Sequence, residues 1–201
     1  LLNLLGGLDT PTNGKIIVDG NDIANLNSDQ LAEYRASKVG FIFQFYNLIP
    51  TLTVLENISL VNEISKDHLD AKQILDGVGL LDHANNFPSE LSGGEQQRVS
   101  IARALAKNPK IVLCDEPTGA LDSKSSKMLL EKFNFLNKEL SATILMVTHD
   151  AFTASYADRV IFIKDGKIFN EINKGDETRK EFFDEIIDVV TLLGGDLNDA
   201  L

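Results

Sequence analysis

The 201-residue sequence lacks the features that identify several classes of protein. It contains one Cys, so no disulfide forms within the chain, and this suits a reducing cytoplasm. Its longest apolar runs are far shorter than the roughly 20 residues that a membrane-spanning helix needs. No charged-then-apolar signal segment stands at its start, and it shows no internal repeat and no low-complexity segment.

Basic residues are also scarce. Lys and Arg number 19 against 30 Asp and Glu, which gives a formal net charge of −11 at pH 7. An acidic surface repels phosphate backbones, and no cluster of Lys and Arg stands out. We therefore expect no nucleic-acid partner. The hydrophobic content of 43% is natural for one domain, or for a domain with a small lobe.

The order of apolar segments predicts an α/β fold with a mainly parallel sheet covered on both faces. The expected strands are residues 15–19, 39–43, 110–115 and 142–148, the last two fully buried, followed by a hairpin over 157–172 that turns at Asp165 and Gly166. The expected helices are residues 28–38 with Ser28 as the cap, 93–107, 123–140 and an amphipathic helix from about 177 to 193. Between residues 54 and about 91 the pattern is helical, broken by polar turns and without a convincing strand, which predicts a helical lobe.

The stretch LSGGEQQRVSIARAL, residues 91–105, has the strongest chemical pattern. Ser92 and Glu95 have the spacing of a capping box at the start of a helix. Gly93 and Gly94 let a ligand approach the backbone, and the free N–H groups of a helix start favour an anion. From the residues alone, a well-capped helix and an anion site remain equal interpretations.

A second pattern is IVLCDEPTGALD, residues 111–122. An apolar strand that ends in Asp115 and Glu116 places two carboxylates at the carboxyl edge of a parallel sheet, where ligands of such folds bind. One carboxylate suits Mg²⁺ and the other suits the polarisation of an attacking water. Many strands end in acids without such a role. Gln44 after VGFIF and His149 after ILMVT are each uninformative alone.

Taken together, these strings resemble the ATP-binding-cassette (ABC) ATPases over about residues 1–167. The resemblance implies a P-loop NTPase-like ABC core with a helical subdomain, and it implies ATP and Mg²⁺ as cofactors. The organisation it implies is a RecA-like core of residues 1–50 and 92–172, a helical subdomain of residues 51–91, and a C-terminal amphipathic helix and tail of residues 173–201.

The same resemblance assigns roles to single residues. Glu116 is the expected general base, His149 the switch histidine that contacts the γ-phosphate, and Gln44 the glutamine that reaches Mg²⁺ or the attacking water. Asp115 is expected to hold Mg²⁺ together with Gln44. Residues 120–122 resemble the loop that contacts the partner subunit. The expected nucleotide contacts are Leu91, Ser92, Gly93, Gly94, Gln96 and Asp122.

The function that the resemblance implies is that of an ATPase subunit that powers a membrane permease. Two copies would form an ATP-dependent homodimer in which the signature motif of residues 91–105 acts in trans. The subunit would be cytoplasmic, held at the inner face of the membrane by the permease. The segment FYNLIPTLTVLENI after Gln44 is either the groove for a permease helix or ordinary packing between lobes.

The narrower resemblance is to the lipoprotein-release and macrolide-export branch. The tail after residue 163 resembles the bacitracin-export type, which is linked to antimicrobial-peptide resistance. Its apolar residues at helical spacing predict docking on the same domain, with a partner surface as the alternative. The transported substrate is set by the permease, so this sequence does not specify it.

The opening string LLNLLGGLDTPTNGKI contains Gly14 and Lys15, which suggest a phosphate-binding loop. The pattern G-x-x-x-x-G-K-[ST] needs Gly at position 9, which is Asp9, and Ser or Thr at position 16, which is Ile16. The pair fits instead the turn and strand that follow such a loop in ABC ATPases. We therefore expect the chain to be an N-terminally truncated piece that lacks the loop and the strands before it, and to bind ATP poorly.

Two alternatives remain. The first is a soluble ABC-type ATPase of DNA repair or ribosome function, although this sequence has neither a long coiled-coil insertion nor a second cassette. The second is a non-catalytic cassette, which Glu116 and His149 argue against. His68 and His83 match no motif, and we expect them to face solvent.

Overall fold

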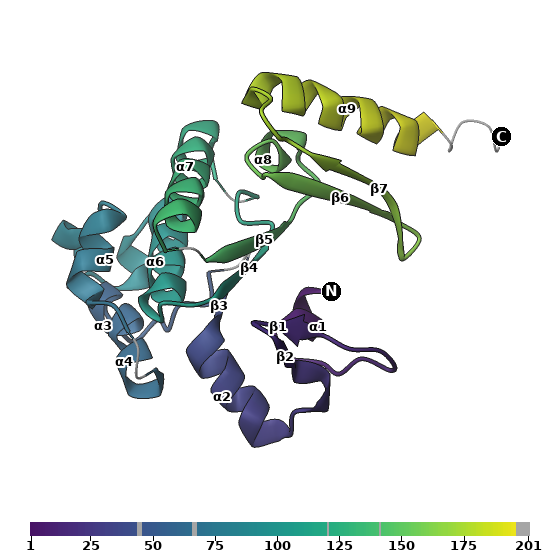
Figure 1. Cartoon of the computed structure of the whole chain (residues 1–201). Coiled ribbons are helices and arrows are strands. Elements are labelled where there is room, and N and C mark those ends of the chain that lie inside the picture. Colours follow the sequence, from purple (N-terminus) through teal and green to yellow (C-terminus); the bar gives the residue numbers. More distant parts are fainter. Residues whose placement is uncertain (44–45, 66–67, 120, 141, 196–201) are drawn as a thin grey trace. The chain divides into compact units, whose positions relative to one another are not determined.

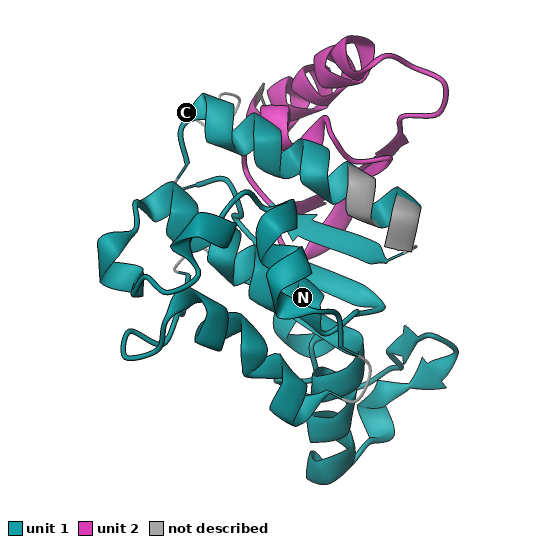
Figure 2. Ribbon diagram, turned by 90° about the vertical axis from the view of Figure 1, so that its left-hand side faces the viewer, with its two compact units in different colours: residues 1–147 teal, residues 148–201 magenta. Residues whose placement is uncertain are grey.

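The computed structural model describes residues 1–43, 46–65, 68–119, 121–140 and 142–195. The chain divides into two compact units, residues 1–147 and residues 148–201 (Figure 2). Among the helices within the described ranges, none combines the length and the apolar character of a membrane span.

A three-stranded parallel sheet organises the first unit (Figure 1). Its strands are β3 (Val39–Ile42), β4 (Ile111–Asp115) and β5 (Thr143–Val147), in the order β3-β4-β5. The register pairs Phe41 with Leu113, and Leu113 with Leu145. Because the strands are parallel, the ends of β4 and β5, Asp115 and Val147, lie at the same edge of the sheet.

Strands β4 and β5, which we expected to be fully buried, differ in how deeply their residues are buried. In β4 the first four residues are buried, as predicted. In β5, all of which the structure describes, every residue is exposed or partly exposed, so that part of the prediction is wrong. An outer position does not explain this, because β3 is also an outer strand of the described sheet and is largely buried. The two differ in their cover, since α2 and α6 contact β3 whereas α7 contacts β5.

Helix α6 (Gly93–Ala106) connects the sheet with the helical part of the first unit, since it contacts β3, α3 and α5. Val99, Ala102 and Ala106 of α6 share a hydrophobic core with the helices before it. Those elements are α3 (Val54–Ser59), α4 (Val61–Ile64), α5 (Ala71–Gly77) and the 3-10 turns η2 (Leu81–His83) and η3 (Pro88–Glu90). As predicted, the described residues between 54 and 91 contain no strand.

The N-terminal part supplies a small hairpin, two helices and a 3-10 turn. Its elements are α1 (Leu2–Leu5), β1 (Ile17–Val18), β2 (Asn21–Asp22), η1 (Ile23–Asn25) and α2 (Ser28–Lys38). Asn27 caps α2, because its side chain accepts the Gln30 N–H at 3.0 Å while the Gln30 side chain accepts the Asn27 N–H at 2.9 Å. The predicted cap, Ser28, is wrong by one residue.

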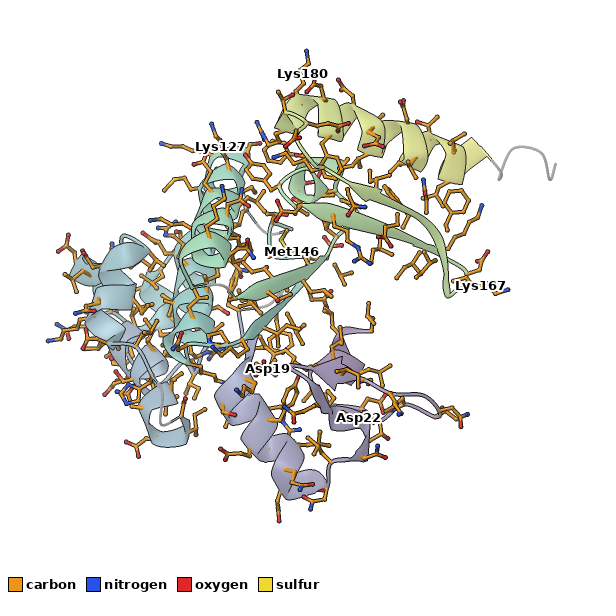
Figure 3. The ribbon with its side chains drawn as sticks, in the orientation of Figure 1. Asp19, Asp22, Lys127, Met146, Lys167 and Lys180 are labelled. Carbon is orange, nitrogen blue, oxygen red and sulfur yellow. The ribbon has the colours of Figure 1, made fainter. Side chains whose placement is uncertain are left out.

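Helix α7 (Ser123–Leu140) has the predicted bounds and contacts β5. Leu129, Leu130 and Phe133 form its buried side. Lys127, labelled in Figure 3, pairs instead with Glu131 at 3.8 Å, and both side chains are more than half exposed. The helix is therefore amphipathic, with its apolar side turned to the protein.

The second unit is a hairpin covered by one long helix. Its elements are α8 (Ala151–Ala154), β6 (Arg159–Lys164), β7 (Lys167–Asn173) and α9 (Arg179–Gly195). The hairpin turns at Asp165 and Gly166, as predicted, and both have positive φ, as a tight two-residue hairpin turn requires. Phe182 and Ile186 of α9 pack on Phe162 of β6, so the tail helix docks on its own unit.

Candidate functional site

The start of α6 is built by a capping box, as the sequence predicts. The Ser92 hydroxyl donates to the Glu95 carboxylate at 2.7 Å, and the Ser92 N–H donates to the same carboxylate at 2.8 Å. These hydrogen bonds from Ser92 hold the pKa of Glu95 below its ordinary value. His83 Nε2 lies 3.8 Å from Glu95 Oε1, so His83 contacts this box rather than only solvent, whereas His68 is exposed as predicted.

The two glycines of the motif are sites of close approach. A Cβ on Gly93 would lie 2.7 Å from the Tyr46 hydroxyl, so a larger residue there would displace the tyrosine. A Cβ on Gly94 would lie 3.7 Å from both Leu121 and Ser125. The structure therefore brings the start of α6 together with the turn that begins α7. A helix start also presents N–H groups without intrahelical acceptors, which favours an anion.

Asp122 has a structural task that the sequence analysis did not assign. Its carboxylate accepts the N–H groups of Lys124 and Ser125, each at 2.9 Å, and the Ser125 hydroxyl at 3.0 Å. These hydrogen bonds, chiefly those from Ser125, lower the pKa of Asp122. The residue therefore begins α7 as its cap.

The carboxyl end of β4 holds the predicted pair of acids. Asp115 is exposed and Glu116 is half-buried. Glu116 adopts φ +46°, a left-handed conformation that costs about 1 kcal/mol or more in a residue with a Cβ. Its N–H donates to the Val147 carbonyl at 3.0 Å, and its carbonyl accepts the Gly119 N–H at 3.1 Å. The backbone thus turns sharply at Glu116 and is held on both sides of it.

These carboxylates fit the Mg²⁺ that the family resemblance implies. Mg²⁺ prefers oxygen ligands and usually keeps several waters, so one or two carboxylates beside a phosphate suffice. The described residues contain no group of three or more His, Cys, Asp and Glu side chains that could hold a metal ion. Asp115, exposed at a sheet edge, is the residue with the right chemistry and access.

The other two predicted catalytic residues, His149 and Gln44, do not belong to the end of β4. His149 is exposed and belongs to the second unit, where Asp150 after it caps α8. Gln44 lies outside the described residues. Leu91 and Gln96 are tied to each other, since the Gln96 side chain donates to the Leu91 carbonyl at 3.1 Å.

A groove lies beside the start of α6, with a volume of about 360 Å³. Its lining is Tyr46, Asn47, Leu48, Pro50, Pro88, Ser89 and Gln96. It joins the segment after Gln44 to the turn η3 of the helical part. The lining is mostly apolar side-chain and proline surface, which suits a protein segment better than a charged ligand.

Two side chains of α6 were missed by the sequence analysis. Arg103 donates to the Asn47 carbonyl at 2.8 Å and to the Tyr46 carbonyl at 3.3 Å. Gln97 is buried and donates to the Pro117 carbonyl at 3.2 Å. The sequence did offer a signal, because both are polar residues on a helix side that is otherwise mainly apolar. Buried polar side chains usually have hydrogen-bond partners, so such positions predict a specific contact.

Comparison with known proteins gives several matches over most of the chain. A family model described as "ABC transporter" matches residues 1–119. The bacitracin export ATP-binding protein BceA of Halalkalibacterium halodurans is 48% identical over 99% of this chain and 81% of that protein. The macrolide export ATP-binding/permease protein MacB of Aggregatibacter actinomycetemcomitans is 48% identical over 87% of this chain and 28% of that protein.

A solved structure is also similar. It is the dimeric structure of a post-hydrolysis state of the ATP-binding cassette MJ0796 bound to ADP and Pi. The TM-score is 0.78 at 41% sequence identity, and the match covers 86% of this chain and 78% of that chain.

Proposed function

This chain belongs to the ABC transporter family as an ATP-binding subunit with the α/β cassette fold of P-loop NTPases, and from this premise we propose that it hydrolyses ATP to power a membrane permease. The observation that carries the proposal is the carboxyl end of β4, where Asp115 is exposed and Glu116 is held in a left-handed turn beside β5.

The residues predicted for the site would each have a task in hydrolysis. Asp115 would hold Mg²⁺, which would neutralise charge on the phosphates. Glu116 would accept a proton from the attacking water, and its half-buried carboxylate is suited to this because its backbone is fixed on both sides. By the family resemblance, His149 would contact the γ-phosphate and Gln44 would reach the metal ion or the water.

The signature segment acts on the nucleotide of a second copy. The start of α6 offers N–H groups and the Ser92 hydroxyl, and Gly93 and Gly94 leave the backbone open to phosphate. Leu91, Gln96 and Asp122 complete the contacts of this face. The dimeric relative with ADP and Pi supports an ATP-dependent homodimer of this kind.

The partner is a transmembrane permease, which holds the subunit at the cytoplasmic face of the membrane. The groove beside α6, lined by Tyr46, Leu48 and Pro88 among others, supports a docking place for a permease segment. We assign residues 1–50 and 92–172 to the core, 51–91 to the helical subdomain and 173–201 to the C-terminal helix and tail. The relatives named for bacitracin and macrolide export support export, with antimicrobial-peptide resistance as its purpose.

A polypeptide of residues 1–201 binds ATP-Mg²⁺ weakly in this proposal. It contains no G-x-x-x-x-G-K-[ST] stretch, and its Gly14–Lys15 pair precedes strand β1 instead of opening a helix. The backbone N–H groups and Lys of such a loop are the main ligands of the phosphates. Calorimetric titration with ATP-Mg²⁺ checks this, and a micromolar affinity contradicts it.

The decisive experiment replaces Glu116 with Gln in the longest natural chain that contains these residues. We expect hydrolysis to fall by about 10²- to 10⁴-fold, the usual contribution of a general base. ATP-dependent dimerisation is retained, because the amide keeps the size of the carboxyl group. Phosphate release and gel filtration with ATP are the measurements.

The matched control is Glu131→Gln on α7, which removes an exposed carboxylate whose ion pair is solvent-screened. It should leave hydrolysis and dimerisation unchanged. Wild-type hydrolysis by the Glu116→Gln variant contradicts the assignment of the base and, with it, the proposed mechanism.

A further inference from the structure

Gln97 of α6 is a buried amide that is only half satisfied. Its side chain is 1% exposed, and its Nε2 donates to the Pro117 carbonyl at 3.2 Å. Its Oε1 has no hydrogen-bond partner within the described part of the chain. A buried carbonyl oxygen without a partner destabilises the folded state, whereas an apolar side chain of the same length avoids that cost.

Stability alone therefore does not account for an amide at position 97. Methionine has nearly the same volume, fills irregular space well and carries no group that needs a partner. What the amide provides, and methionine does not, is the hydrogen bond to Pro117. The function of Gln97 must lie in what that bond holds.

The bond holds the segment that carries the catalytic carboxylate. Pro117 is buried and follows Glu116 directly. Glu116 is in a left-handed conformation, which persists only where its surroundings determine it. On one side the Glu116 N–H is fixed by the Val147 carbonyl of β5, and on the other its own carbonyl closes a turn with the Gly119 N–H. Gln97 adds an anchor from a third element, α6.

We propose that Gln97 is a positioning residue for the general base, fixing the Glu116–Pro117 segment against the signature helix. Gln97 lies one turn from the start of α6, at which Ser92 and Gly94 bind nucleotide in the proposed function, and the inference rests on that function. The bond makes the orientation of the Glu116 carboxylate depend on the position of α6. A small displacement of a catalytic group is enough to slow a reaction strongly.

The test replaces Gln97 with Met in the longest natural chain that contains these residues. We expect kcat for ATP hydrolysis to fall by about tenfold, a modest loss for a misplaced catalytic group. KM for ATP should stay within about twofold, because Gln97 contacts no part of the nucleotide site. The melting temperature should stay close to the wild-type value, because the variant removes the partnerless Oε1 of Gln97 but leaves the Pro117 carbonyl without its Gln97 donor.

The matched control is Ser100→Ala. Ser100 lies on the same helix, is fully buried, and its Oγ likewise has no partner among the described residues. The control removes an unsatisfied polar atom from α6 without touching the Glu116 segment. It should keep the wild-type kcat and KM, and should match Gln97→Met in melting temperature.

A second measurement does not depend on turnover. Hydrogen exchange of the Glu116 and Gly119 amides should become faster in Gln97→Met and stay unchanged in Ser100→Ala. Where Gln97→Met does not fold, Gln97→Asn serves instead, because it keeps a buried amide but withdraws it by one methylene from the Pro117 carbonyl. It should show the same loss of kcat.

The outcomes separate the two proposals. Wild-type kcat and unchanged exchange in Gln97→Met, with Glu116→Gln inactive, overturn the positioning role alone. Full activity of Glu116→Gln overturns the proposed function on which this inference rests. A fall in kcat with a parallel rise in KM or a lower melting temperature also overturns the inference, since it indicates a general structural defect.

Discussion

Strands β4 and β5 have similar sequences and different surroundings. They lie side by side in the parallel sheet, and each has five residues of mainly apolar character. The first four residues of β4 are at most 8% exposed, whereas the β5 residues range from partly to clearly exposed, with Val147 at 40%. Apolar composition predicts a strand, but the helices that cover the strand decide how deeply it is buried, since the outer strand β3 is buried under α2 and α6.

The difference continues beyond the strands. After β4 the chain turns at Glu116 and remains in the first unit. Hydrogen bonds to β5, from α6 and within the turn itself hold it there. After β5 the chain enters the second unit, where Asp150 begins α8. The inner strand thus delivers the proposed general base from a fixed position, and the outer strand leads to His149 in a separate unit.

The strongest test of this comparison uses Leu113 and Leu145, which are register partners on β4 and β5. Leu113 is 1% exposed, so Leu113→Ala leaves a cavity and should cost about 3–4 kcal/mol of unfolding free energy. Leu145 is only partly buried, so Leu145→Ala should cost about 1–2 kcal/mol. Urea unfolding measures both. Equal losses would mean that the two strands are equally buried in solution.

A smaller effect is expected after β5, at the cap of α8. The Asp150 carboxylate accepts the N–H groups of Phe152 and Thr153 at 3.2 and 3.0 Å, and the Thr153 hydroxyl at 2.6 Å. Asp150→Ala should cost about 1–2 kcal/mol locally, the usual value for a lost cap. Faster amide exchange over residues 151–155 is the expected readout.

The control for the cap is Asp188→Asn, which changes an exposed acid on α9 of the same unit. It should leave exchange over residues 151–155 unchanged. If Asp150→Ala also leaves that exchange unchanged, then α8 does not depend on its cap, and the segment after β5 is held by other contacts.

The smallest effect concerns Cys114 of β4, the register partner of Met146 of β5, which is labelled in Figure 3. Burial raises the pKa of the Cys114 thiol well above its ordinary value, so the folded protein keeps the thiol protonated. The unfolded chain releases that proton near pH 8.5, so stability is present below this pH and is lost as the pH rises. The loss should reach about 1 kcal/mol by roughly pH 9.2.

Urea unfolding from pH 7.5 to 9.5 measures this loss, and Cys114→Ala should remove its thiol-dependent part. In the same comparison, a thiol reagent at pH 8 should not label native Cys114 without denaturant, whereas peroxide should oxidise the partly buried Met146. Rapid labelling of Cys114 would contradict the burial of β4.

Local signals in the sequence were sufficient for several elements. The bounds of α7, the hairpin turn at Asp165–Gly166 and the Ser92–Glu95 capping box follow from residues close together in the chain, and all three are confirmed. The cap of α2 shows the limit of such signals. Asn27 and Ser28 both favour caps, and the choice depends on the fit to Gln30.

Other features depend on residues far apart in the sequence. The exposure of β5 depends on which helices cover the sheet, and the anchoring of Pro117 by Gln97 joins residues that are twenty positions apart. The left-handed conformation of Glu116 was not predictable either, because Glu has no intrinsic preference for it. Sequence reasoning identified Asp115 and Glu116, but the way they are held emerges only from the fold.

Three side chains along α6 and at its end donate hydrogen bonds to other segments of the chain. In each of the three, the acceptor is a main-chain carbonyl oxygen. Gln97 donates to the Pro117 carbonyl, Arg103 to that of Asn47, and Lys107, at the C-terminal end of the helix, to that of Arg35 at 3.3 Å. Every residue type carries that acceptor, so substitution cannot delete it. As far as these hydrogen bonds are concerned, the side chains of the accepting residues can change, while a one-residue insertion or deletion beside them would break the pairing. These bonds therefore constrain length in the accepting segments and residue identity in the donating helix.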